Sequence, residues 1–289
     1  LDPETFKTGV ALCQIIPGAT AMQAAAYVGL KARGATGAAA AFVGFGLPAF
    51  LFMMVLSFLY SRFHDLPAAI SLFAGLQAII VGIVANAAVS FGGNALKGWR
   101  DMLIAGAAAF LFAFHVSPIL VIVLASLAGL LITSAGQKKT GPSAIPSPCH
   151  SGTNHSFGLL VAGAAGFFLL LFFVQRSFFD LAILMSKIDL FAFGGGFASI
   201  PLMLHEIVDV RGWIDARTFM NGIVLGQVTP GPIVITATFV GYLLYGIPGG
   251  AIATIGIFLP SFLMVIGIAP HFERLRSSPY FNRAIHGIL

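Results

Sequence analysis

Long apolar segments separated by short polar connections run along the chain. Many of these segments approach the roughly 20 residues that an α-helix needs to cross the hydrocarbon core of a bilayer. This pattern is typical of a protein whose helices pass through the membrane several times. We therefore predict an all-α polytopic membrane protein with helices at residues 7–30, 37–60, 67–90, 101–115, 117–135, 157–175, 179–208, 216–245 and 247–270.

The composition supports this fold class. Hydrophobic residues make up 58% of the chain and charged residues only 9%, whereas about 25% of the residues of a soluble domain are charged. The net charge of +5 could suggest a nucleic-acid partner. The basic residues, however, lie in short clusters between apolar segments, as in the cytoplasmic loops of membrane proteins. We therefore predict membrane lipid, and no nucleic acid, around this chain.

One polar segment divides the chain. Residues 137–156 are rich in serine, proline and glycine, a composition typical of a flexible, solvated linker. We predict two units, residues 1–136 and residues 157–289, joined by this linker. The first unit would lack its first helix and the second would be truncated at its end, so we expect a piece of a longer two-copy protein.

The two units carry the same sequence pattern, because residues 1–34 match residues 214–246. Chance similarity between apolar helices would pair leucine, alanine and valine, not glutamine and Pro-Gly steps, so we interpret the match as a duplication. In the first part of the match, Asp2, Thr5, Phe6, Gly9, Leu12, Gln14, Pro17 and Gly18 correspond to Asp215, Thr218, Phe219, Gly222, Leu225, Gln227, Pro230 and Gly231. After a one-residue gap, Val28, Gly29, Gly37, Gly44, Leu47, Pro48, Phe50 and Leu51 correspond to Val240, Gly241, Gly249, Gly256, Leu259, Pro260, Phe262 and Leu263.

The charges predict that the two copies face opposite sides of the membrane. Between its two repeat helices, the first copy carries Lys31 and Arg33, where the second has Leu243 and Tyr245. After the second repeat helix, the second copy is the more basic one. Since positive loops favour the cytoplasm, this reversal indicates two inverted-topology repeats.

Each copy contains a Gln-x-x-Pro-Gly step inside an apolar helix. Proline removes a helical hydrogen bond and the adjacent glycine lets the chain unwind. The half-helix that follows begins with free N–H groups and a partial positive charge, which favour an anion. We predict substrate-binding breaks in transmembrane helices, with a simple packing kink as the alternative. The residues concerned are Gln14, Pro17 and Gly18 in the first copy, and Gln227, Thr229, Pro230 and Gly231 in the second.

Three consecutive glycines, Gly194–Gly196, interrupt another apolar segment. They follow no predicted strand and precede no Gly-Lys-Ser/Thr, so they do not indicate a phosphate-binding loop. We predict a third break that contributes to the same substrate site, with close helix packing as the alternative.

Four charged residues flank this glycine segment. We assign Lys187 and Arg211 to substrate binding, and Asp189 and Glu206 to proton coupling, because ionisable groups at membrane depth usually mark a pathway. An interfacial location is the alternative for all four. No metal-ligand spacing and no nucleophile–base pattern occurs in the sequence, so we predict no metal, no cofactor and no enzymatic activity.

These motifs resemble those of the chromate transporter family over nearly the whole chain. The motifs of the second copy are FGGGFASIPLM at Phe193–Met203, RGWID at Arg211–Asp215, GQVTPGP at Gly226–Pro232 and TFVGYL at Thr238–Leu243. The first copy adds LCQIIPG at Leu12–Gly18 and GFGLP at Gly44–Pro48. The glycine-rich motif that the family carries in its first half is absent here.

The resemblance implies a bacterial inner-membrane protein that exports chromate and confers chromate resistance. Chromate is a tetrahedral dianion like sulfate, so a transporter of sulfate or another oxyanion is the alternative. A membrane reductase would need a cofactor motif, and a structural subunit would not need duplicated polar breaks. The sequence leaves the oligomeric state open, with a homodimer as one candidate.

Overall fold

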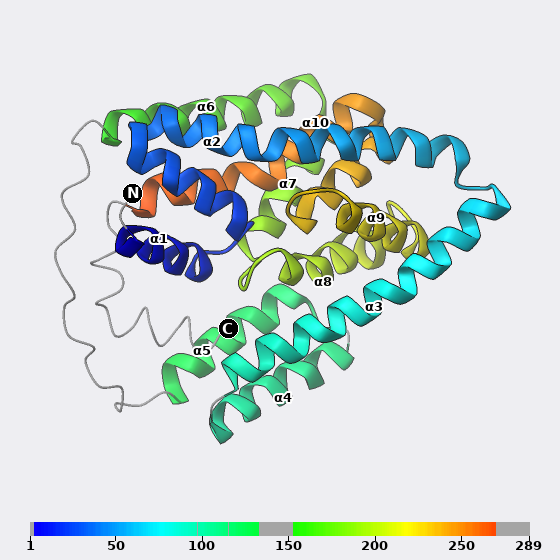
Figure 1. The fold of residues 1–289 in the computed structure, drawn as a ribbon, viewed down its shortest axis with the longest axis horizontal. Helices are drawn as coiled ribbons and strands as arrows, with labels where there is room; N and C mark the ends of the chain where they lie inside the picture. Colours follow the sequence, from blue (N-terminus) through cyan, green and yellow to red (C-terminus); the bar gives the residue numbers. More distant parts are fainter. Residues whose placement is uncertain (1–2, 97, 115, 133–152, 270–289) are drawn as a thin grey trace.

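A computed structural model describes residues 3–96, 98–114, 116–132 and 153–269. Within these ranges the chain forms helices and no β-strands (Figure 1). In chain order the elements are α1 (Pro3–Ile15), α2 (Thr20–Phe63), α3 (Pro67–Ala95), α4 (Trp99–Ala113), α5 (Pro118–Ile132), α6 (Thr153–Val174), α7 (Arg176–Leu190), the 3₁₀-helix η1 (Gly196–Ala198), α8 (Ser199–Met203), the π-helix η2 (Leu204–Val210), α9 (Ala216–Val228), the 3₁₀-helix η3 (Ile233–Ile235) and α10 (Thr236–Ile268). Most of the predicted linker, and the end of the predicted second unit, lie outside the described residues.

Helices long and apolar enough to cross a membrane confirm the predicted fold class. Four such helices occur among the described residues, at Thr20–Phe63, Pro67–Ser90, Phe157–Val174 and Ile233–Ile268. Large apolar side chains such as Val89 and Phe173 point outward from them, as expected where lipid tails replace water. The protein is therefore an all-α polytopic membrane protein.

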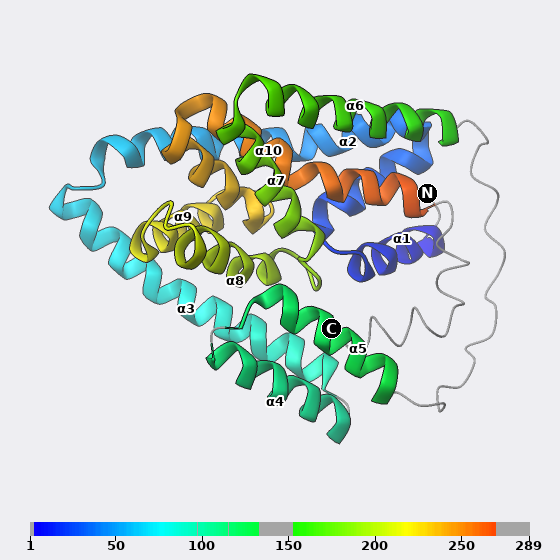
Figure 2. The ribbon, with the colours of Figure 1, turned by 180° about the vertical axis from the view of Figure 1, so that it is seen from behind.

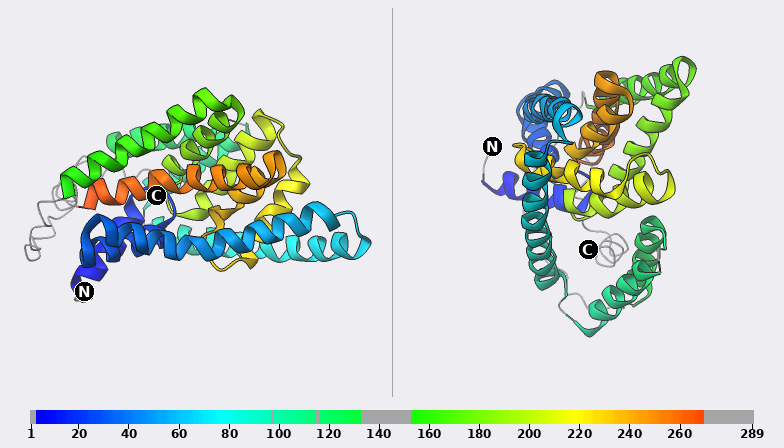
Figure 3. Two further views of the ribbon diagram at one scale, coloured as in Figure 1. Left: turned by 90° about the horizontal axis from the view of Figure 1, so that it is seen from above. Right: turned by 90° about the vertical axis from the view of Figure 1, so that its right-hand side faces the viewer.

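The body of the molecule is built around α7 and α10. α2 runs beside α10, and α6 lies along the outer side of this layer (Figures 1 and 2). α1 and α9 lie on the inner side, and the segment after α1 meets the segment after α7. Helices α3, α4 and α5 form an arm that projects from this body, as the right-hand view of Figure 3 shows.

α2 and α10 each turn sharply at a two-residue interruption. Arg33 and Gly34 have φ/ψ of −142°/26° and 65°/−152°, and Tyr245 and Gly246 have −139°/20° and 64°/−149°. These are equivalent positions of the proposed repeats, and the conformations agree within a few degrees, as a duplication would produce. Each interruption falls where the sequence predicts the end of one helix and the start of the next.

The two arms of each turn meet through glycine. A Cβ atom on Gly29 would overlap the carbonyl of Gly37, and one on Gly241 would overlap the carbonyl of Gly249. Small residues of this kind let two helix backbones approach closely in a membrane. The same packing therefore occurs in α2 and in α10.

Candidate functional site

The first Pro-Gly step breaks the chain between two helices, as the sequence predicts. α1 ends at Ile15 and α2 begins at Thr20. Between them Gly18 has φ of 113°, and its N–H donates to the carbonyl of Ala192 at 2.9 Å. The carbonyl of Pro17 accepts a hydrogen bond from Gln23 Nε2 at 2.6 Å. The break is therefore held by α2 itself and by the segment that follows α7.

Pro260 leaves a backbone carbonyl of α10 free to accept a hydrogen bond from α7. Proline has no N–H, so the carbonyl four residues earlier, on Gly256, lacks its helical donor. Ser186 Oγ donates to that carbonyl at 2.9 Å. One turn along α7, Asp189 accepts from Ser261 N–H at 2.8 Å through Oδ2 and from Ser261 Oγ at 2.9 Å through Oδ1. The turn of α10 around Pro260 thus pairs with two polar side chains on one face of α7.

Ser261 also reaches the first break. Ala19 N–H donates to Ser261 Oγ at 3.2 Å, and Gln23 Nε2 donates to it at 3.3 Å. A Cβ atom on Gly18 would overlap this hydroxyl and would lie 2.9 Å from Asp189 Oδ1. We call this cluster of Gly18, Gln23, Asp189 and Ser261 the Asp189 node. Both Gln23 and Asp189 are fully buried in it.

The second Pro-Gly step also breaks the chain, between α9 and η3. Thr229 is buried, and the hydrogen of its hydroxyl is used in a bond to the carbonyl of Gly226 at 2.7 Å. Pro230 and Gly231 are exposed, unlike the buried Gly18 of the first break. Gln227 Nε2 is buried and has no hydrogen-bond partner within the described part of the chain. An unpaired buried donor of this kind costs free energy unless a ligand or water accepts from it.

The glycine segment lies between the helices that follow the two breaks. Gly194 and Gly195 have φ of 84° and 93°, a region that side chains other than glycine rarely occupy. A Cβ atom on Gly195 would lie 3.3 Å from Thr20 Oγ1, at the start of α2. One on Gly196 would lie 2.8 Å from Ile233 Cγ2, at the start of η3. Gln14, in the last turn of α1, is exposed.

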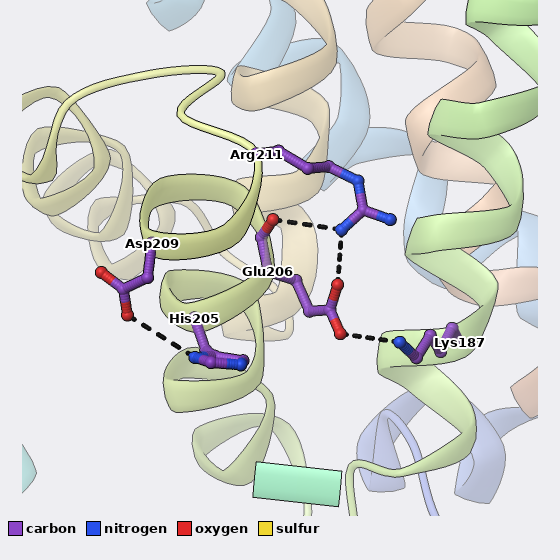
Figure 4. Close-up of polar contacts among 5 residues, drawn as sticks. All are labelled: Lys187, His205, Glu206, Asp209 and Arg211. Atoms are coloured by element: carbon purple, nitrogen blue, oxygen red, sulfur yellow. Dashed lines mark hydrogen bonds and ion pairs between the residues drawn. The ribbon is translucent and has the colours of Figure 1, made fainter. Parts of the chain in front are cut away.

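Glu206 joins the two basic residues that we assign to substrate binding (Figure 4). Its Oε1 lies 2.7 Å from Lys187 Nζ, and its Oε2 lies 2.5 Å from Arg211 Nη1. Only 7% of the Glu206 side chain is exposed, against 42% for Lys187 and 32% for Arg211. The three residues form a cluster with two cations and one anion, on the side of α7 that faces η2. π-Helical turns such as η2 are rare and often occur at functional sites.

Three further titratable groups have local partners. His205 and Asp209 of η2 lie 3.7 Å apart (Figure 4). Asp215 caps α9, because its side chain accepts from Thr218 Oγ1 at 2.7 Å and from Thr218 N–H at 2.9 Å. These hydrogen bonds lower the pKa of Asp215 below its usual value. No group of three or more metal-ligating side chains occurs among the described residues.

The structure thus separates the four charged residues of the predicted site into two groups near the end of α7. Asp189 lies with the first break, and Lys187 lies with Glu206 and Arg211. Sequence reasoning did not identify Gln23 or Ser261. The available signals were a lone glutamine six residues after Pro17, and a serine after Pro260 where the first copy has alanine after Pro48.

The sequence is similar to those of known transporters. The family model described as chromate transporter matches residues 1–130 and 179–289. An uncharacterized transporter of Methanocaldococcus jannaschii is 42% identical over 290 residues, which cover 100% of this chain and 72% of the relative. Chromate transport proteins of Cupriavidus metallidurans and Pseudomonas aeruginosa are each 29% identical, over 98% and 100% of this chain and 68% of each relative.

No solved structure matches the chain. The family match covers most of the sequence, including both Pro-Gly breaks, the glycine segment and the residues around Glu206. The chain therefore belongs to the chromate transporter family.

Proposed function

We propose that this protein carries chromate out of the cell across the cytoplasmic membrane and so confers chromate resistance. Family membership and the relatives named as chromate transport proteins support the substrate. The membrane-spanning helices fit a carrier, and the polar helix breaks offer donors to an oxyanion. Transport of sulfate or another tetrahedral oxyanion is the alternative, because such an ion presents the same charge and shape.

One observation carries this proposal: the glycine segment lies between the starts of the two half-helices that follow the Pro-Gly breaks. A Cβ atom on Gly195 would lie 3.3 Å from Thr20 Oγ1, and one on Gly196 would lie 2.8 Å from Ile233 Cγ2. The starts of half-helices offer N–H groups and partial positive charge to an anion. Glycine allows a ligand to approach the backbone closely. Gln227 Nε2, which is buried and unpaired, adds a side-chain donor near the second break.

The Lys187–Glu206–Arg211 cluster supplies the positive charge that a dianion requires. Its two cations and one anion leave a net positive charge at α7 and η2, the elements that precede and follow the glycine segment in the chain. Because Glu206 holds both cations, they attract an anion less strongly than free side chains would. A binding site for a transported ion must release it again, so this partial neutralisation suits a carrier.

The two breaks differ in exposure, which suits alternating access. Pro230 and Gly231 are exposed, whereas Gly18 is buried. In the proposed cycle, rocking of one repeat against the other exposes the two breaks in turn. The membrane potential, negative inside, favours the exit of an anion by about 2.3 kcal/mol per charge for each 100 mV.

Uptake of labelled chromate into inverted membrane vesicles tests the function. We expect chromate uptake only in vesicles that contain the protein. Excess sulfate should inhibit this uptake only if the site accepts both ions. The label should stay as chromate, since a reductase would convert it. Absence of protein-dependent uptake would contradict the proposed function.

Two variants test the site. Replacement Gln227→Ala removes one hydrogen bond to a charged ligand and should weaken chromate binding about tenfold. Gln175→Ala, at an exposed position between α6 and α7, is the matched control and should bind as the wild type does. If Gln227→Ala and Pro230→Ala both leave chromate transport intact, the second break is not part of the site.

A further inference from the structure

Asp189 is a fully buried carboxyl group whose described partners are all neutral. Its side chain accepts hydrogen bonds from the N–H and the hydroxyl of Ser261, and its exposed fraction is 0%. A buried carboxylate normally needs a cationic partner, because burial removes its hydration. Within the described ranges no cationic side chain forms an ion pair with Asp189.

The charged groups around Asp189 are engaged elsewhere. On its own helix, Lys187 pairs with Glu206 of η2, which also holds Arg211. The other titratable groups of η2, His205 and Asp209, pair with each other. From α10 and from the α1–α2 break, the node contains the neutral Ser261, Gln23 and Gly18, of which Ser261 donates to Asp189 and Gln23 donates to Ser261.

Hydrogen-bond accounting fixes the direction of the Ser261 hydroxyl. A serine hydroxyl has one hydrogen and two acceptor lone pairs. The N–H of Ala19 and Gln23 Nε2 occupy both lone pairs, so the hydrogen must point to Asp189. The carboxyl therefore receives two donors, which suits its ionised form. Among the described residues, the only positive charge that this network brings close to Asp189 is the partial charge at the start of α2, through the N–H of Ala19.

An unpaired acceptor lies in the same cluster. Gln23 Oε1 is buried and has no hydrogen-bond partner among the described residues. Gln23 Nε2 donates to the carbonyl of Pro17 and to Ser261 Oγ. These two acceptors set the orientation of the Gln23 amide, because the amide oxygen could not donate to them in place of the nitrogen. The node therefore lacks one donor, while it contains a carboxylate that lacks a counter-charge. A proton bound to Asp189 would supply the missing positive charge.

A metal cation fits the node less well than a proton. Hard cations are held by several oxygen atoms at once. Here the carboxylate oxygens already accept from Ser261, and N–H donors of Ala19 and Gln23 point into the same space. A proton requires a single free lone pair on Asp189 and no rearrangement of these donors.

We propose that Asp189 binds a proton when the oxyanion binds, so that each dianion is accompanied by about one proton. This inference rests on the proposed function. Ionised Asp189 and the oxyanion both use the positive start of α2, and they repel each other. Binding of the oxyanion therefore favours protonation of Asp189, and protonation favours binding of the oxyanion by the same factor, because linkage is reciprocal.

Simultaneous measurement of chromate binding and of proton uptake tests this linkage. Purified full-chain protein in weakly buffered detergent solution is titrated with chromate at alkaline pH, with a pH indicator present. We expect proton uptake close to one per bound chromate in the wild type and none in Asp189→Asn. Chromate affinity should fall as pH rises in the wild type, and should not depend on pH in Asp189→Asn. Titration of chromate without protein corrects for protonation of chromate itself.

Two further variants control the measurement. Asp180→Asn makes the same chemical change at an exposed position of α7 and should keep the proton uptake of the wild type. Ser261→Ala keeps the carboxyl but removes one donor to it, and the alanine at the equivalent position 49 indicates that the helix tolerates this residue. In Ser261→Ala we expect the pH of half-maximal uptake to rise by about one unit. The pH of half-maximal uptake in Ser261→Ala tests the linkage even if Asp189→Asn does not fold.

The outcomes separate the two proposals. Chromate binding without proton uptake in the wild type, or equal uptake in Asp189→Asn, overturns the linkage and leaves the proposed function intact. Unchanged proton uptake and pH dependence in Ser261→Ala also overturns it. No chromate binding by the wild type overturns the proposed function, and with it the linkage.

Discussion

Ala49 and Ser261 occupy equivalent positions of the two proposed repeats, and each packs against the Pro-Gly break of the other repeat. A Cβ atom on Gly231 would lie 2.6 Å from Ala49 Cβ, and one on Gly18 would overlap Ser261 Oγ. This exchange is what two halves related by a twofold axis would show. The chemistry differs, however, because alanine makes an apolar contact whereas serine connects the break to Asp189. The first break is therefore tied to an ionisable group by a contact that the second lacks.

Substitution at Gly18 should disrupt the first break. We expect Gly18→Ala to destabilise the protein by about 2 kcal/mol, because φ of 113° strains any side chain and the new methyl group would displace the Ser261 hydroxyl. Thermal unfolding of the purified protein in detergent measures the change. Gly44→Ala is the matched control, since a Cβ atom at Gly44 meets nothing within 4 Å. Alanine should slightly stabilise the helix there, so equal effects at both positions would contradict the assigned packing.

The sharp turns in α2 and α10 should respond alike to the same substitution. At Gly34 and Gly246, φ is 65° and 64°, and a Cβ atom would meet nothing within 4 Å. The cost of alanine at either position is then a pure backbone cost of about 1–3 kcal/mol. We expect Gly34→Ala and Gly246→Ala to lower the unfolding temperature by similar amounts. A large difference between them would show that the two turns are not equivalent.

Local chemistry explains why much of the fold could be predicted. Apolar segment length predicts membrane-spanning helices, and Pro17-Gly18, Gly194–Gly196 and Pro230-Gly231 break helices whatever surrounds them. The structure places breaks at all three sites. It also shortens the predicted helix at 179–208 to α7 and the short elements after it, because Gly194 and Gly195 adopt positive φ.

The partners of the charged residues could not be predicted, because they come from distant parts of the chain. Asp189 and Ser261 are 72 residues apart, and Gln23 and Ser261 are 238 residues apart. Apolar periodicity does not specify which polar groups meet across helices. The sequence identifies Lys187 and Arg211 as basic residues on either side of the glycine segment. Only the structure shows that Glu206 binds both.

The cap of α9 should make stability depend on pH in acid. Hydrogen bonds from Thr218 lower the pKa of Asp215 in the folded state. The stabilisation by this cap is therefore fully present above the pKa of the unfolded state, about 4, and is lost as the pH falls through the pKa of the folded state. At neutral pH, Asp215→Ala should cost about 1 kcal/mol of stability. This difference from the wild type should shrink in acid. Asp215→Asn keeps a capping oxygen and should unfold near the wild-type temperature, and a pH-independent loss in Asp215→Ala would contradict the assignment.

The Lys187–Glu206–Arg211 cluster should behave as one unit. Replacement Glu206→Gln leaves two cations without their anion, and breaking a fully buried pair costs about 3–5 kcal/mol. Because Lys187 and Arg211 are partly exposed, we expect a smaller loss of about 2 kcal/mol, measured by thermal unfolding in detergent. In the double variant Lys187→Met/Glu206→Gln the loss should be smaller than the sum of the single losses, since one unpaired cation has been removed. Asp209→Asn, at an exposed position that pairs with the partly buried His205, is the control and should change stability by less than about 0.5 kcal/mol. Strict additivity of the two single losses would mean that Lys187 and Glu206 do not interact, and that the cation remains free to attract the substrate by itself.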